Sequence, residues 1–93
     1  MKIELKEKQQ TGKLFVGEEN NPKAEMQFTR ESEHILNVKH TEVLEELKGQ
    51  SVGRKLLDYL AKKARNENFK IKADCSYVQH VFNKYDDYKD VQL

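Results

Sequence analysis

The most regular pattern of apolar positions lies in the second half of the chain and has the period of a helix. Apolar residues recur there at spacings of one, three and four, and they are Val52, Leu56, Leu57, Leu60, Ala61 and Ala64. This spacing places them on one face of an amphipathic helix, with charged residues on the opposite face. The pattern predicts a helix over residues 51–66, which starts in a turn that contains Gly49 and Gly53.

The first half of the chain alternates between apolar and polar residues, which is the period of half-buried strands. The apolar side of these stretches comprises Ile3 and Leu5, then Leu14 to Val16, then Ala24, Met26 and Phe28, and finally Leu36, Val38 and His40. Polar clusters at residues 9–12, 18–22 and 30–33 separate the stretches, and residues 41–49 connect to the helix. Because connections this short join antiparallel neighbours, we expect a meander of about four antiparallel strands.

Two further elements follow the predicted helix. Residues 69–74 alternate as a last strand, residues 75–85 have the apolar spacing of a short second helix, and residues 86–93 form a polar tail. A succession of strand, helix and strand is a right-handed crossover between parallel strands. The sequence therefore predicts an α+β fold: an α/β-type mixed sheet in which a four-stranded meander leads into a β-α-β crossover and a short C-terminal helix.

The composition indicates one small domain over residues 1–93. Hydrophobic residues make up 37%, charged residues 35%, and the formal net charge is +1, which argues against nucleic-acid binding through overall charge. The lone Cys75 excludes an internal disulfide and fits a reducing compartment, and no histidine and cysteine spacing suggests a metal site. Without a signal-peptide pattern or an apolar run of membrane-spanning length, we expect a soluble cytoplasmic protein.

The charge at the start of the predicted helix is unusual. A helix begins with unpaired backbone N–H groups and partial positive charge, yet Lys48, Arg54 and Lys55 gather there. A phosphate held by backbone N–H groups between glycines would balance these charges. We therefore interpret residues 49–55 as a phosphate-binding loop, and the alternative is an ordinary loop before a solvated basic helix.

The predicted crossover places this loop beside the ends of the two parallel strands, where open α/β arrangements bind ligands. By strand parity, His40 continues the face of Leu36 and Val38, and both His40 and Cys75 can point into that region. Cys75 lies at the start of the second predicted helix, where the dipole favours a thiolate, so it is a candidate nucleophile with His40 as its base. The alternatives are a small buried apolar cysteine and a structural histidine.

Three short sequence motifs follow one another along the chain. They are His40-Thr41-x-Val43, then Gln50-Ser51-Val52-Gly53-Arg54-Lys55, then Cys75-Ser76-Tyr77-Val78, with Tyr85-Asp86-Asp87-Tyr88 near the end. The second block matches the first four positions of the pyrophosphate loop Gln/Arg-x-x-Gly-x-Gly/Ala and departs from it at Lys55, while Ser51 replaces a glycine that many members have. Taken together over residues 24–88, the blocks resemble the compact, single-domain subgroup of the GNAT superfamily, the acetyl-CoA-dependent N-acetyltransferases.

The resemblance implies a GNAT-like fold, acetyl-CoA or CoA as the cofactor, and acetyl transfer to an amine on a small molecule or a protein. It places the pyrophosphate on residues 50–54 and the pantetheine along residues 41–43. The implied cofactor-binding residues are Thr41, Val43, Gly49, Gln50, Ser51, Val52, Gly53, Arg54 and Lys55. In the same subgroup the cysteine that matches Cys75 is a candidate acetyl acceptor, and here His40 is its candidate base.

Several alternatives stay open at this point. A carboxylate in residues 42–46 can activate the amine through water, and Tyr77 or Tyr85 can protonate the departing thiolate. The helices that cover the acceptor in longer members are missing, so we expect an open acceptor site, and a non-catalytic CoA-binding or protein-interaction module is the alternative function. Weak nucleic-acid binding by the basic residues between 48 and 63 lacks the interleaved aromatic residues of single-strand binders.

Overall fold

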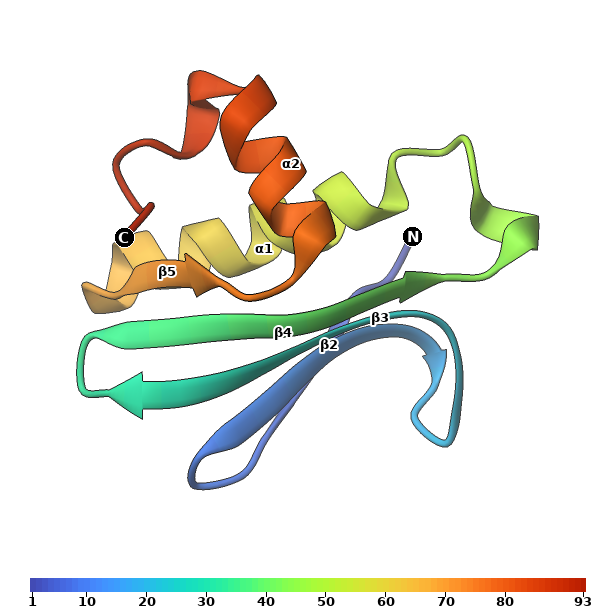
Figure 1. Cartoon of the computed structure of the whole chain (residues 1–93). Helices are drawn as coiled ribbons and strands as arrows, with labels where there is room; N and C mark the ends of the chain where they lie inside the picture. The colour runs from blue at the N-terminus through green and yellow to red at the C-terminus, as the bar shows by residue number, and fades with distance from the viewer.

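The computed structural model describes all residues, 1–93, as one five-stranded sheet with two α-helices (Figure 1). The strands stand in sequence order across the sheet. Their bounds are Glu4–Glu7 (β1), Thr11–Glu18 (β2), Asn21–Ser32 (β3), Ile35–Val43 (β4) and Lys70–Ala73 (β5). The helices are Val52–Glu67 (α1) and Ser76–Lys84 (α2), and the single 3-10 turns Glu45–Leu47 (η1) and Asp86–Tyr88 (η2) complete the chain.

The topology confirms the prediction from the sequence. Strands β1 to β4 pair antiparallel as a meander, and β5 pairs parallel with β4 after the crossover through α1. The hairpin connections are shorter than predicted, because only residues 8–10, 19–20 and 33–34 lie between the strands of the meander. Residues 11–12, 21–22 and 41–43, which we expected in connections, are strand residues, because their backbone pairs with the neighbouring strand.

The predicted apolar face of α1 forms the centre of the core. All six of its apolar positions are buried, together with Gly53. They pack in one cluster with the inner face of the sheet, with α2 and with the chain end, to which Leu14, Met26, Leu36, Val38, Val78, Val81, Tyr88 and Val91 contribute. Figure 1 shows both helices on one side of β2, β3 and β4, which leaves the outer face of these strands without a covering helix.

A β-bulge in β4 reverses the strand parity on which the placement of His40 rested. Gln27 pairs with His40 while Phe28 pairs with Val38, so Lys39 has no partner on β3. An extra residue moves all later side chains to the opposite face. His40 is consequently exposed on the outer face beside Gln27, and Thr41 takes the inner position. The expectation that His40 continues the face of Leu36 and Val38 is wrong for this reason.

The polar tail is part of the fold. Tyr88 and Val91 are buried in the core, and the chain then runs along the outer edge of β5. There the Ile71 N–H donates to the carbonyl of Val91 at 2.6 Å, and the Leu93 N–H donates to the carbonyl of Ile71 at 3.0 Å. Neither helix of the protein has the length and apolar character that a membrane span requires.

Candidate functional site

The two parallel strands, β4 and the edge strand β5, part midway along β4, and this opening is the centre of the candidate site. Pairing between β4 and β5 ends at Val38 and Ala73, whereas β4 continues to Val43. Immediately after the last pair, the N–H groups of Asp74 and Cys75 both donate to the Val38 carbonyl, at 3.1 and 2.9 Å. The chain then turns into α2, so the β4 edge beyond Val38 has no neighbouring strand.

A groove of about 470 Å³ lies between this free edge and the start of α1. Its lining residues are Thr41, Glu42, Val43, Leu47, Lys48, Gly49, Ser51, Val52, Gly53 and Tyr77. The fold thus brings the end of β4 and the loop before α1 together, as the sequence predicts. Of the nine predicted cofactor-binding residues, only Gln50, Arg54 and Lys55 do not line the groove.

The start of α1 presents backbone N–H groups that the protein does not use. The first backbone hydrogen bond of the helix runs from the Lys55 N–H to the Ser51 carbonyl at 3.0 Å, and no side chain caps the helix. The amides of residues 52–54 therefore have no backbone acceptor. Adjacent free amides at the positive end of a helix form an anion cradle. The loop reaches this geometry through left-handed backbone at Gly49, with φ 83°, and at Ser51, with φ 58°.

At position 53 a neighbouring side chain leaves no room for any residue larger than glycine. A Cβ atom at this position would lie 2.7 Å from both Cζ and Oη of Tyr77, which comes from α2. The Tyr77 ring therefore packs directly on the helix start and forms one wall of the groove. Its partial burial raises the pKa of the Tyr77 phenol, so the side chain stays protonated and can donate a proton into the groove.

The three cations of the loop do not act alike. Lys55 is exposed, and the exposed Lys48 pairs with Glu45 at 3.3 Å. Arg54 instead turns toward the C-terminal segment: its Nε donates to the Tyr88 hydroxyl at 3.1 Å, and its guanidinium carbon lies 3.8 Å from the centroid of the Tyr85 ring. Its backbone amide belongs to the cradle, whereas its side chain fastens the tail to α1.

The structure gives Cys75 a different partner from the one predicted. Cys75 is 6% exposed and is the N-cap residue of α2, which agrees with its expected place at a helix start. Its Sγ–H donates to Oγ1 of Thr41 at 3.3 Å. His40 lies on the opposite face of β4, so the thiol and the imidazole are not brought together. The sequence could not reveal the contact with Thr41, because a one-residue bulge leaves no mark on the alternation of residues.

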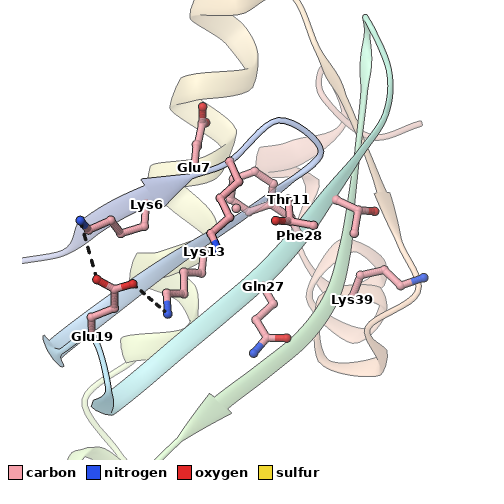
Figure 2. A pocket seen from close by; sticks show the side chains of 11 residues that line it. Lys6, Glu7, Thr11, Lys13, Glu19, Gln27, Phe28 and Lys39 are labelled. Carbon is pink, nitrogen blue, oxygen red and sulfur yellow. Dashed lines mark ion pairs between the residues drawn. The ribbon is translucent and has the colours of Figure 1, made fainter.

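A second hollow, which sequence reasoning missed, lies on the outer face of the sheet (Figure 2). It measures about 520 Å³, and its lining includes four lysines, Lys6, Lys8, Lys13 and Lys39. Figure 2 shows Lys6 and Lys13 directed toward Glu19, with which they pair at 3.7 and 3.5 Å. The alternation that places Lys6 and Lys13 on the polar side of their strands was the available signal. None of the predicted site residues lines this hollow.

Parallel strands that part beside an uncapped helix start, after an antiparallel meander, define the class of folds to which GCN5-related N-acetyltransferases belong. The sequence profile described as GCN5-related N-acetyl-transferase matches residues 13–91. The chain belongs to this family of N-acetyltransferases, as a compact single domain.

Solved structures agree with this assignment. The chain is similar to a GCN5-like protein from Staphylococcus aureus that is described as a candidate N-acetyltransferase: they share 41% identity over 97% of this chain and 87% of that one, with a TM-score of 0.79. A ribosomal-protein-alanine N-acetyltransferase from Brucella melitensis biovar Abortus 2308 shares the fold, with 18% identity, a TM-score of 0.62, and coverage of 92% and 64%. No curated protein sequence matches the chain.

Proposed function

We propose that this protein binds acetyl-CoA in the groove between β4 and α1 and transfers the acetyl group to an amine. The observation that carries the proposal is the anion cradle at the start of α1, because the amides of residues 52–54 are free and this helix start lines a groove that continues along an unpaired strand edge. The family membership supplies the ligand, whose pyrophosphate fits the cradle and whose amide-containing arm fits a strand edge.

The residues that would hold the cofactor follow from this fit. The amides of residues 52–54 would bind the pyrophosphate, with Gly49, Gln50, Ser51 and Lys55 around them. The β4 edge at Thr41 and Val43 would bind the pantetheine arm through its backbone groups. A backbone N–H near Val43 would polarise the thioester carbonyl, and Tyr77, which stands over Gly53, would protonate the departing thiolate.

Two routes of transfer are compatible with the groove. In the first, a neutral amine attacks the thioester carbonyl, the carbon–sulfur bond breaks, and CoA leaves as the thiol with the proton that Tyr77 donates. The proton that the amine gives up then restores the Tyr77 hydroxyl. In the second, the Cys75 thiol attacks first, CoA leaves as the thiol, and the amine then takes the acetyl group from Cys75. The geometry favours the first route, because Cys75 is buried and its bonded partner is the hydroxyl of Thr41 and not a base.

The acceptor amine has open access to the groove. The chain passes from β1 to β2 through residues 8–10 alone, so no helix covers the outer face at this point (Figure 1). A large acceptor such as a protein terminus could therefore approach as readily as a small amine. We place the reaction in the reducing cytoplasm, which would keep the lone Cys75 as a thiol.

Calorimetry with acetyl-CoA tests the binding site. Ser51→Asp puts a carboxylate beside the cradle, and we expect it to weaken binding about tenfold or more, since like charge opposes the pyrophosphate. Ser32→Asp makes the same exchange at an exposed hairpin end and should bind as the wild type does. The absence of heat with the wild-type protein at millimolar acetyl-CoA would refute the proposal.

The intact mass after incubation with labelled acetyl-CoA separates the two routes. A stable or transient acetyl adduct on Cys75, together with loss of turnover in Cys75→Ala, would establish the second route. Turnover that Cys75→Ala largely retains would establish direct transfer. Binding without release of CoA in the presence of amines would indicate the non-catalytic CoA-binding module instead.

A further inference from the structure

Asn37 is the only polar or charged residue that the fold buries, with 0% of its surface exposed. It lies in β4, next to Val38, at the last stretch where β4 and β5 pair. Its neighbours across the register are Thr29 on β3 and Lys72 on β5. Burying an amide side chain costs free energy unless its hydrogen bonds are made, so the contacts of Asn37 are informative.

The side-chain amide of Asn37 uses both of its ends. Its Nδ2 donates to Oε2 of Glu31 at 2.7 Å and to Oδ2 of Asp74 at 2.9 Å. Its Oδ1 accepts the backbone N–H of Asp74 at 3.1 Å. Lys39 pairs with Asp74 at 2.8 Å, and Lys72 pairs with Glu31 at 3.5 Å, so each carboxylate also has a cation. We call Glu31, Asn37, Lys39, Lys72 and Asp74 the Asn37 network.

The network joins the three strands at the point where the groove begins. Asp74 is both a side-chain and a backbone partner of Asn37, and the next residue is Cys75. The Val38 carbonyl, directly after Asn37, accepts the N–H groups of Asp74 and Cys75. The bonds that Asn37 makes to Asp74 therefore hold the end of β5 and the start of α2, and Cys75 is the next residue in the chain.

The charges of the network make Asn37 hard to replace. Glu31 in β3 and Asp74 after β5 face the same amide, and both are ionised. The hydrogen bond from Asn37 holds the pKa of the Glu31 carboxyl below its usual value, and the hydrogen bonds from Lys39 and then Asn37 do the same for the pKa of Asp74. Without the amide between them, the two carboxylates would face each other with only Lys39 and Lys72 as counterions. An apolar residue at this position would take a hydrogen-bond donor from each of them and leave each with its lysine partner alone.

We propose that Asn37 is a positioning residue that acts through Asp74: it fixes the start of α2 and thereby holds Cys75 and the opening between β4 and β5 in place. The effect of Asn37 on the position of the Cys75 thiol does not depend on acetyl-CoA. Its consequence for catalysis rests on the function proposed above.

The reactivity of Cys75 toward 2,2′-dithiodipyridine, measured without acetyl-CoA, tests the placement of the thiol. The wild-type thiol should react slowly because it is 6% exposed. Asp74→Ala and Glu31→Ala are a matched pair, since each removes one exposed carboxylate partner of Asn37 but only Asp74 adjoins Cys75. We expect a rate increase of about fivefold or more for Asp74→Ala and less than about twofold for Glu31→Ala. Equal rates for the two variants would overturn the proposal.

Replacing Asn37 gives a pH-dependent readout that a general loss of packing would not produce. Asn37→Asp places a third carboxylate among Glu31 and Asp74, so the opening of the start of α2 should increase as these groups ionise, from about pH 4 to about pH 7. Asn37→Ala should react faster at every pH by a constant factor relative to the wild type. Asn66→Asp, an exposed exchange on α1, serves as the control. A wild-type profile for Asn37→Asp would contradict the proposal.

Binding and turnover then separate the two proposals. In Asp74→Ala the amides of α1 are untouched, so the dissociation constant for acetyl-CoA should stay within about twofold of the wild-type value while the rate of acetyl transfer falls about tenfold. Failure of the wild-type protein to bind acetyl-CoA would refute the proposed function but leave the thiol measurements intact. Unchanged turnover in a variant with a released thiol would refute the catalytic part of the positioning role.

Discussion

At the scale of single residues, Gly53 offers the sharpest test of how the groove is built. Gly53→Ala would place its Cβ 2.7 Å from Cζ and Oη of Tyr77, which belong to a rigid phenol group. The ring must move or the helix start must shift. We expect the free energy of unfolding to fall by about 1–3 kcal/mol, the usual cost of overpacking, as measured by urea denaturation.

The variant Tyr77→Ala supplies the control in a double-mutant cycle. With the ring removed, Gly53→Ala should cost less than about 0.5 kcal/mol, because the three atoms nearest to the new methyl group all belong to Tyr77. Additive effects of the two substitutions would show that the strain lies in the backbone and not in the contact with Tyr77.

The same residues show what a sequence can reveal about a site. Gly53 belongs to a loop pattern and was found, but the reason for it includes Tyr77, which is 24 positions away in the chain. Alternation predicts His40 on the inner face of β4, but the bulge at the unpaired Lys39 puts His40 on the outer face. A bulge is set by how β3 and β4 pair, which the order of residues in β4 alone does not record.

At the scale of elements, the start of α1 carries strain that one substitution can release. Ser51 has φ 58°, a left-handed conformation that costs a residue with a side chain about 1–2 kcal/mol. Glycine adopts this conformation freely but loses about 0.5–1 kcal/mol in chain entropy. Ser51→Gly should therefore raise the free energy of unfolding by about 0.5–1 kcal/mol, and it should not weaken acetyl-CoA binding, since the backbone amides stay in place.

Asn68→Gly is the matched control at the other end of α1. Asn68 is the C-cap residue with φ 62°, and asparagine tolerates this conformation better than serine does. Its replacement should therefore gain less than that of Ser51, by thermal or urea unfolding. A larger gain at Asn68 would indicate that the Ser51 side chain makes a compensating interaction.

The elements themselves were largely predictable. The apolar face of α1 is long and strictly periodic, and the meander follows from repeated alternation, so both agree with the structure. The ends of the strands were harder to predict, as residues 21–22 and 41–43 show. Polar residues at a strand end have no periodic signal, and the neighbouring strand decides whether their backbone pairs.

At the scale of the whole molecule, the C-terminal segment connects parts of the fold whose contact has no signal in the amino-acid sequence. Residues 86–93 are mostly polar, yet Tyr88 and Val91 complete the core. The Tyr88 hydroxyl donates to Asp58 and accepts from Arg54, so the tail holds the first two turns of α1. Such contacts are non-local, and a short polar tail has no period from which they could be predicted.

Tyr88 makes the stability of the whole fold dependent on pH in the alkaline range. Burial, followed by the hydrogen bond to Asp58, raises the pKa of Tyr88 from 10.0 to about 12. Below about pH 10 the phenol is protonated in both the folded and the unfolded chain, so its stabilising contribution is complete. Between the two pKa values the unfolded chain releases the proton and the folded chain keeps it, and stability therefore falls as pH rises.

Tyr88→Phe separates this contribution from the titration of lysines and other tyrosines, which is common to both proteins and cancels in the difference. Near pH 8 the variant should be less stable by about 1 kcal/mol, because Asp58 and Arg54 lose a hydrogen-bond partner. Over about pH 10 to pH 12 the wild-type advantage should shrink by on the order of 2 kcal/mol and reverse, since phenylalanine has no proton to lose. Tyr59→Phe, at a side chain that is 38% exposed, should follow the wild type throughout. Equal stability of wild type and Tyr88→Phe at every pH, in urea unfolding, would mean that the tail is held by packing of the Tyr88 ring alone.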